Sequence, residues 1–363
     1  MPISFARGAP SLDIVAVDEL RDAAVRGFEN DAKGTTAYGT SVGYAPLREW
    51  IAERQGVEVD QVVVTNGSMQ ADAFLFETLV GPGDLVVVEA PTYDRTLLNL
   101  RHRGAEILAI PLEEDGIDVG AFESALEAGA KPVLAHIIPT FQNPAGYTLS
   151  AEKRARLLEL AAKYEFTIFE DDPYIEVRFE GEPLATMLSG DPAGRVVYAS
   201  SFSKTVCPGI RVGWLTGPAE LIKRITTLAT NTYISPSMVS QSIVNEFCRG
   251  GGLDRSIEVV RGALRDRRNA LVAALREQLP DARFTPPQGG YFMWVEFPEG
   301  TDVDALFEAA KARDVQFVKG TDFLLEGGEN TLRLAYSGVT TDEIGEGIAR
   351  LAEAYGAIQP AAA

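Results

Sequence analysis

Short apolar runs alternate with longer amphipathic segments through the middle of the chain. The apolar runs have the length of buried strands, and the amphipathic segments between them have helical spacing. The runs are QVVV (61–64), DLVVVEA (84–90), PVLAHII (132–138), FTIFE (166–170), RVVYAS (195–200) and IRVGWLTG (210–217). This alternation predicts an α/β protein in which helices cover both faces of a mainly parallel sheet.

The pattern changes after about residue 280, where short strands are joined by hairpins and flanked by helices. This pattern of strands and helices is typical of a smaller α+β domain. The chain begins with an extended segment and a helix over 17–29. We therefore expect an arm and helix over 1–36 that belong to the small domain, a large domain over 37–280, and a C-terminal small domain over 281–363.

Charge and composition exclude several classes of function. A formal charge of −19 disfavours binding to nucleic acid or to an anionic membrane, because such a surface repels phosphates. The sequence contains no apolar run long enough to cross a membrane, and its first residues lack the features of a signal peptide. We therefore expect a cytoplasmic protein with neither nucleic acid nor membrane as a partner.

Cysteine and histidine, two common metal ligands, are rare in this sequence. The only cysteines are Cys207 and Cys248, and the only histidines are His102 and His136. This number is too small for a disulfide framework or a cysteine zinc cluster. His136 lies inside an apolar run, so we expect a core histidine with a hydrogen-bond partner. No metal is expected.

Polar residues gather directly after the apolar runs, at the carboxyl ends of the predicted strands. Open α/β sheets bind their ligands at this edge. A glycine turn before Ser68 opens a helix whose free N–H groups suit an anion, although Ser68 could be an ordinary helix cap. Tyr93 could stack on a flat ligand or simply pack. Asn143 could bind a ligand or serve the turn formed by Pro144 and Gly146.

Two later strand ends carry charged groups. Asp171 and Asp172 follow a strand apolar enough to be central, so at least one of them needs a cation or a strong donor. In the alternative interpretation, one aspartate is partnered and the other is solvated. The stretch SSFSKTVCPGIRVGW (200–214) comes next and contains hydroxyls, a lysine and an arginine.

Ser201, Ser203 and Arg211 in that stretch could hold a dianionic phosphate. The sequence contains no GxxxxGK[ST] loop and no GxGxxG motif after a strand, so a nucleotide is not the obvious ligand that carries this phosphate. A phosphate site with a buried aspartate, an aromatic ring, an amide, a tyrosine and Lys204 meets the requirements of pyridoxal 5′-phosphate (PLP).

The sequence resembles the fold-type I PLP-dependent aminotransferases, in particular the 2-aminoadipate and aromatic amino-acid subgroup. The motifs SFSKTVCPGIRVG, FQNPAG and EDDPY carry the resemblance in this order, and it covers nearly the whole chain. The resemblance implies a sheet of the seven-stranded type, with PLP bound to the large domain over 37–280.

The resemblance also assigns roles to individual positions. Lys204 matches the lysine that forms the Schiff base, Asp171 the partner of the ring nitrogen, and Tyr93 the stacked aromatic. Asn143 and Tyr174 match groups that bind the ring hydroxyl oxygen. The positions that match phosphate ligands are Ser68, Met69, Gln70, Ser201, Ser203 and Arg211, with Met69 and Gln70 acting mainly through their backbone.

Other matched positions concern the substrate and a second subunit. Arg333 matches the arginine that pairs with the substrate α-carboxylate, and Gly8 the arm backbone that meets it; Asn143 is expected to contact substrate as well. Tyr38 matches a tyrosine that reaches the phosphate of the other subunit, which implies a homodimer with shared active sites. Arg7 and Lys319 are candidate cations for a second substrate carboxylate, and surface charges in the alternative interpretation.

The expected activity is transfer of an amino group from an L-amino acid to a 2-oxo acid, with 2-oxoglutarate as acceptor, by a ping-pong mechanism. Lys204 would move the substrate proton, and we expect burial and Arg211 to lower its pKa. Alternatives are another fold-type I PLP enzyme, such as a lyase, a decarboxylase or a specialised biosynthetic enzyme, and a non-catalytic ligand sensor.

Overall fold

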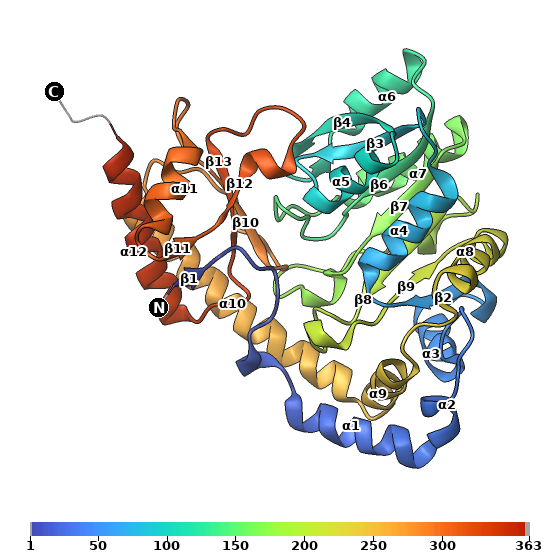
Figure 1. The fold of residues 1–363 in the computed structure, drawn as a ribbon. Coiled ribbons are helices and arrows are strands. Elements are labelled where there is room, and N and C mark those ends of the chain that lie inside the picture. Colours follow the sequence, from blue (N-terminus) through green and yellow to red (C-terminus); the bar gives the residue numbers. More distant parts are fainter. Residues whose placement is uncertain (1, 360–363) are drawn as a thin grey trace.

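The computed structural model describes residues 2–359 and contains a large central sheet (Figure 1). Its strand order is β2-β9-β8-β7-β6-β3-β4-β5. The strands are β2 (Val62–Thr65), β9 (Gly213–Thr216), β8 (Val196–Ser201), β7 (Thr167–Asp171), β6 (Pro132–Ile137), β3 (Leu85–Ala90), β4 (Glu106–Glu113) and β5 (Gly116–Ile117). Neighbours from β8 to β4 are parallel, which confirms the predicted mainly parallel sheet. The two-residue β5 adds an eighth strand to the seven expected.

Helices cover both faces of this sheet. They are α4 (Ser68–Leu79), α5 (Asp94–His102), α6 (Val119–Glu127), α7 (Ala151–Tyr164) and α8 (Ala219–Tyr233). Val86 and Val88 of β3 pack in the core beneath α4, α5 and α8, whereas Val87 packs with α6 and α7. Because successive side chains of a strand point to opposite faces, a strand buried on both sides has a continuous apolar sequence.

The C-terminal part forms a second, smaller α+β body. A three-stranded antiparallel sheet has the order β10 (Phe292–Glu296), β13 (Thr331–Ala335), β12 (Val318–Lys319). Helices α11 (Val303–Lys311) and α12 (Thr341–Ile358) pack with it around one apolar core. The N-terminal β1 (Ile3–Ser4) joins this part by pairing with β11 (Val315–Gln316). The N-terminal arm thus contacts the C-terminal body, although the two lie more than 300 residues apart in the sequence.

A long helix, α10 (Gly252–Gln278), links the two bodies (Figure 1). Its Leu253 and Ile257 pack with α3 (Ala45–Gln55) and α9 (Met238–Arg249), whereas Leu264 and Leu271 belong to the C-terminal core. The remaining helices are α1 (Val17–Asn30), α2 (Ala32–Thr36) and short 3₁₀ turns at Leu12–Ile14, Val59–Gln61, Ile175–Val177, Leu188–Gly190, Pro208–Ile210 and Gly320–Phe323.

The domain boundaries at residues 36 and 280 stay a prediction. The structure differs in one respect from the expectation that the arm and the first helix share the small domain. Helix α1 lies along α9, where an Arg26 guanidinium N–H donates to the carbonyl of Glu246 at 3.3 Å. The side of α1 that contains the buried Ala23 and Gly27 is therefore covered by a helix of the middle segment, and the arm before α1 joins the C-terminal body.

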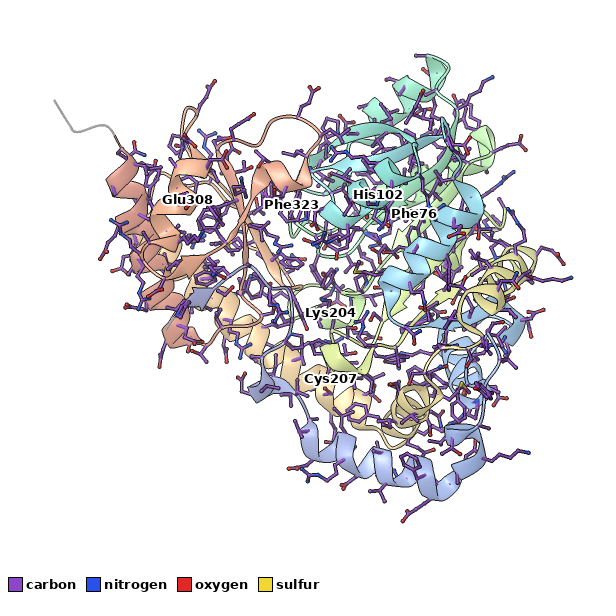
Figure 2. The ribbon with its side chains drawn as sticks, in the orientation of Figure 1. Phe76, His102, Lys204, Cys207, Glu308 and Phe323 are labelled. Carbon is purple, nitrogen blue, oxygen red and sulfur yellow. The ribbon has the colours of Figure 1, made fainter. Side chains whose placement is uncertain are left out.

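The carboxyl ends of β3, β6, β7 and β8 face the C-terminal body. Figure 2 shows Lys204, just beyond β8, in the middle of the molecule between these two parts. The position agrees with the general rule that α/β sheets bind ligands beyond the carboxyl ends of their strands. In residues 2–359, no helix has the length and apolar character needed to cross a membrane.

Candidate active site

A cavity of about 630 Å³ lies at this edge of the sheet. All the site residues expected from the sequence line it, with the exceptions of Gln70, Tyr38 and the candidate cation Lys319. They come from the arm, from α4, from the ends of four strands and from β13. The cavity therefore gathers residues from both bodies of the molecule.

One end of the cavity is built to receive an anion. Helix α4 begins at Ser68, and no side chain caps its first turn, so its N–H groups and the positive end of its dipole are available. The preceding Gly67 has φ 86°, and a Cβ there would lie 2.1 Å from Arg211 Nη2. Only glycine allows the arginine to approach this turn.

Arg211 is held against the turn by hydrogen bonds. Its guanidinium donates to the Asn66 carbonyl at 3.2 Å and to Ser203 Oγ at 3.3 Å. Ser201 Oγ and Ser203 Oγ lie 2.9 Å apart. A guanidinium, two hydroxyls and a helix N-terminus together match the charge and geometry of a phosphate dianion.

Gln70 and Tyr38 do not reach this end of the cavity. The Gln70 N–H donates to the Gly67 carbonyl at 3.1 Å, and its side-chain Oε1 accepts from the Asn66 N–H at 2.8 Å. This N–H already closes the turn and Gln70 does not line the cavity, so the expected backbone contact of Gln70 with phosphate stays a prediction. Tyr38 is 91% exposed and lies outside the cavity of its own chain.

Lys204 projects into the centre of the cavity. Its Nζ donates to the Gly8 carbonyl at 2.6 Å, and the Tyr291 hydroxyl donates to its backbone carbonyl at 2.6 Å. Loss of solvation lowers the pKa of Lys204 to about 8, and the positive charges of Arg333 and Arg211 act in the same direction. The direction expected from the sequence is confirmed, and a large fraction of this amine is neutral at mildly alkaline pH.

Asp171, at the end of β7, faces the cavity, and His136 lies beside it. His136 Nε2 is 3.5 Å from Asp171 Oδ2, yet neither ring nitrogen makes a hydrogen bond within residues 2–359. The expected hydrogen-bond partner of His136 is therefore not observed, although its burial is confirmed. Asp171 Oδ1 is also buried and has no hydrogen-bond partner in the described chain.

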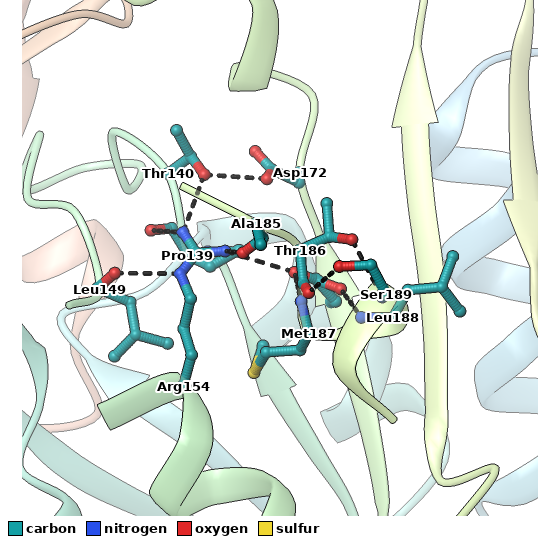
Figure 3. Close-up of polar contacts among 11 residues, drawn as sticks. Pro139, Thr140, Leu149, Arg154, Asp172, Ala185, Thr186, Met187, Leu188 and Ser189 are labelled. Atoms are coloured by element: carbon teal, nitrogen blue, oxygen red, sulfur yellow. Dashed lines mark hydrogen bonds and ion pairs between the residues drawn. The ribbon is translucent and has the colours of Figure 1, made fainter. Parts of the chain in front are cut away.

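Asp172 points away from the cavity into a buried polar network (Figure 3). Its Oδ2 accepts from the Thr140 hydroxyl at 2.8 Å, and Thr140 accepts from Arg154 at 3.2 Å. Arg154 also donates to the carbonyls of Pro139 and Leu149. Burial raises the pKa of Asp172 to about 8. The network anchors both ends of the loop that carries Asn143, so Asp172 is the aspartate with a partner inside the protein.

Arg333 lies at the other end of the cavity. Its Nη1 donates to Asn143 Oδ1 at 2.8 Å and its Nη2 to the Ala6 carbonyl at 2.6 Å, whereas its buried Nε has no partner in residues 2–359. The guanidinium carbon lies 4.3 Å and 4.8 Å from the ring centroids of Phe292 and Phe323. Aromatic walls keep this cation in a region from which water is largely excluded.

The two candidate cations for a second substrate carboxylate differ in position. Lys319 Nζ pairs with Asp304 at 2.5 Å and lines a separate surface hollow, so it does not reach the cavity. Arg7 lines the cavity, and its side chain has no ion-pair partner in the described residues. The structure therefore leaves Arg7 as the candidate.

Three comparisons relate this architecture to known proteins. Residues 2–351 match the family model described as aminotransferase class I and II. The chain is 37% identical to aromatic-amino-acid aminotransferase 1 of Thermococcus litoralis, over 97% of this chain and 87% of the relative. The chain belongs to this family.

Solved structures agree with this membership of the class I and II aminotransferases. A kynurenine aminotransferase of Pyrococcus horikoshii, solved with PMP, superposes with a TM-score of 0.95 at 36% identity, over 99% of this chain and 92% of that one. An α-aminoadipate aminotransferase of Thermus thermophilus, complexed with N-(5′-phosphopyridoxyl)-L-leucine, superposes with a TM-score of 0.93 at 33% identity. The match covers 98% of this chain and 92% of that one. The fold is that of the fold-type I enzymes.

The cavity of this aminotransferase fits PLP, its cofactor. The uncapped start of α4 with Arg211 suits the phosphate, and the unpartnered Asp171 Oδ1 requires a donor, which a protonated ring nitrogen supplies. The unpartnered Arg333 Nε requires an acceptor, which a carboxylate supplies. The polar groups left open by the protein thus correspond to those of cofactor and substrate.

Some residues of the aminotransferase site were missed from the sequence. Asp72, Asp94, Arg95 and Asp322 also line the cavity, and Tyr291 holds the Lys204 backbone. Asp72 could have been found, because it lies four residues after Ser68 and so on the same side of a helix. Asp322 and Tyr291 are placed by long-range folding, for which the sequence carries no local signal.

Proposed function

We propose that this PLP-dependent aminotransferase transfers the amino group of an L-amino acid to 2-oxoglutarate by a ping-pong mechanism. The observation that carries the proposal is the position of Lys204, whose amine is placed in one cavity with Asp171 and Arg333. PLP, when bound, supplies a ring that accepts the electrons of the bond broken at the substrate α-carbon.

The residues of the chain take distinct parts in this chemistry. Lys204 moves the proton at the substrate α-carbon, and its pKa of about 8 supplies the neutral amine that this transfer needs. Asp171 holds the proton on the ring nitrogen. Asn143 and Tyr174 orient the ring hydroxyl, and Tyr93 stacks on the ring. Arg333 binds the substrate α-carboxylate by a paired hydrogen bond, and the arm at Gly8 covers it.

The choice of acceptor rests on Arg7. A ping-pong enzyme must accept both substrates in one pocket, and a second carboxylate needs a second cation. The relative from Thermus thermophilus is named for α-aminoadipate and is complexed with a leucine adduct. We propose that Arg7 pairs with the side-chain carboxylate of 2-oxoglutarate and turns to solvent when an apolar substrate enters.

The active site is proposed to be shared across a homodimer in the cytoplasm. Tyr38, which we assign to the phosphate of the partner's site, is 91% exposed and has no place in the cavity of its own chain. Leu12 and Ile234 are also large apolar side chains exposed on the single chain, at 83% and 56%. Apolar surface of this kind is costly unless a second subunit covers it.

A substrate panel tests the proposed reaction. Purified holoenzyme is given 2-oxoglutarate with each L-amino acid in turn, and glutamate formation is measured. We expect glutamate from at least one acidic or aromatic donor. Absence of glutamate with every donor, together with release of carbon dioxide or ammonia, would replace transamination by a lyase or decarboxylase activity.

Subunit mixing tests the shared site. Tyr38→Ala and Lys204→Ala proteins, each inactive, are mixed under conditions of subunit exchange. One hybrid site then contains both wild-type residues, so activity is expected to return in part. An active protein with the hydrodynamic mass of one chain would contradict the shared site.

A further inference from the structure

Asp72 is a second carboxyl group at the ring end of the cofactor cavity. It lies on α4 one turn after Ser68 and lines the same cavity as Asp171 and Tyr93. The residue is only 5% exposed, and its Oδ1 makes no hydrogen bond within residues 2–359. Asp72 thus combines a place in the cavity wall with a buried oxygen that the described protein leaves without a partner, which points to a ligand as that partner.

The surroundings of Asp72 make an ionised carboxylate unfavourable in the ligand-free protein. No lysine, arginine or histidine lies within ion-pair distance of it in the described part of the chain. Burial raises the pKa of Asp72 well above its usual range, and the negative charge of Asp171 acts in the same direction. An uncompensated carboxyl group lowers stability, and proteins accept such a cost mainly at functional sites.

Other groups around Asp72 do not relieve this cost. Burial raises the pKa of Tyr93 to about 12, and the negative charges of Asp94, Asp72 and Asp171 act in the same direction. Tyr93 is therefore a neutral phenol at physiological pH. Its hydroxyl is directed at Met69 Sδ, 3.8 Å away. Arg95 lines the cavity and His136 lies beside Asp171, but no basic side chain of the described residues forms an ion pair with Asp72, so a positive charge on what binds there would favour its ionised form.

We propose that Asp72 acts together with Asp171 to stabilise the positive charge on the ring nitrogen of PLP. The inference rests on the proposed role of Asp171 at that nitrogen. A protonated ring nitrogen is the one cation that PLP brings to this end of the cavity, and a cation favours the ionised form of every carboxyl group near it. Asp72 is therefore a residue that tunes the protonation of the ring, and Asp171 remains the direct partner.

The test compares the binding of PLP and of its carbocyclic analogue, in which a C–H group replaces the ring nitrogen. The full-length apoenzyme is titrated with each compound, binding is followed by intrinsic fluorescence, and the ratio of the two Kd values is taken. This ratio isolates the ring nitrogen, because both compounds make the same contacts elsewhere. Wild type, Asp72→Asn, Asp72→Leu and Asp171→Asn are compared, with Glu77→Gln on the exposed side of α4 as the matched control.

In Asp72→Asn and Asp72→Leu, the Kd of PLP divided by the Kd of the carbocyclic analogue is expected to rise about tenfold. This change is equivalent to lowering the pKa of the bound ring nitrogen by about one unit. Glu77→Gln is expected to leave the ratio unchanged. Asp72→Leu also removes an unpartnered buried carboxyl group, so its apoenzyme is expected to unfold at or above the wild-type temperature.

An unchanged ratio in both Asp72 variants, or failure of both to fold, overturns the inference and leaves Asp72 a structural residue. Asp171→Asn separates this result from the proposed function. A shift in Asp171→Asn without one in the Asp72 variants removes only the role of Asp72. No shift in Asp171→Asn removes the assignment of Asp171 to the ring nitrogen as well, and the inference fails with it.

Discussion

The two ends of the active-site cavity are built in different ways. The phosphate end consists of strand ends and a helix start within one sheet, where Arg211 bonds to Asn66 and Ser203. The substrate end joins segments from opposite ends of the chain, because Arg333 bonds to the Ala6 carbonyl and Lys204 to the Gly8 carbonyl. Strand ends of one sheet thus form the phosphate end, whereas the substrate end is completed by the N-terminal arm, which is held by β1–β11 pairing and by hydrogen bonds to distant segments.

This difference has a functional consequence. Phosphate is present in every turnover, so a preformed site binds it without reorganisation. Substrates alternate in a ping-pong reaction, and Arg7, which lines the pocket and has no ion-pair partner in the described residues, is the arm side chain that we propose adapts to each of them. Mutations at the phosphate end should therefore affect all substrates alike, and mutations in the arm should discriminate among them.

The largest effect is expected at the point where the two ends meet. Lys204→Ala removes the group that moves the substrate proton, and we expect turnover to fall by about 10⁴-fold or more. The phosphate end is untouched, so the variant should still bind PLP. Steady-state kinetics and equilibrium dialysis measure the two properties. Retention of more than a few per cent of the activity would assign proton transfer to another residue.

The next effect compares two neighbouring carboxyl groups. Asp171→Asn removes the charge that faces the ring nitrogen and should lower kcat by about 10² to 10³-fold, in keeping with the loss of one strong electrostatic interaction. Asp172→Asn should lower it far less, because burial raises the pKa of Asp172 to about 8 and an amide resembles the neutral acid. The reverse order of the two variants would place the catalytic carboxylate one residue later.

The rate at which the apoenzyme binds PLP covalently is expected to rise about tenfold per pH unit below the pKa of Lys204. Only the neutral Lys204 amine attacks an aldehyde. With a pKa of about 8, its neutral fraction rises with pH below 8 and levels off above it. Stopped-flow absorbance at a series of pH values measures this profile. A midpoint near the ordinary lysine pKa would contradict the environment described for Lys204.

The smallest effect is expected in the arm. Arg7→Ala removes the cation proposed for the second carboxylate, and kcat/KM for 2-oxoglutarate should fall about tenfold relative to an apolar 2-oxo acid. Initial rates with both acceptors give this ratio. Lys319→Ala is the matched control, since Lys319 pairs with Asp304 outside the cavity. Equal losses with both acceptors, or no loss, would remove Arg7 from substrate recognition.

The same division between the two ends explains what could be predicted from the sequence. Asn143, Asp171 and Ser201 follow apolar runs closely, and Arg211 lies in the connection between β8 and β9; the carboxyl ends of parallel strands meet at one edge of a sheet. Local order along the chain was therefore sufficient to group them. The same rule identified the sheet and its covering helices.

Predictions failed where contacts between distant parts of the chain determine the partner of a side chain or a helix. Lys319 pairs with Asp304, and α1 packs on α9 and not on the C-terminal body. Each outcome depends on which neighbour lies nearby after folding. Residue type and position along the chain do not contain that information, and the substrate end of the cavity depends on it most.

The proposed chemistry depends most on Lys204, which we propose binds PLP covalently. Reduction of the holoenzyme with borohydride, followed by digestion and mass mapping of the phosphopyridoxyl label, identifies the lysine that is bound. We expect a single labelled peptide with the modification on Lys204, and none in Lys204→Ala. A label on any other lysine, or the same labelling in Lys204→Ala, would show that another residue binds the cofactor.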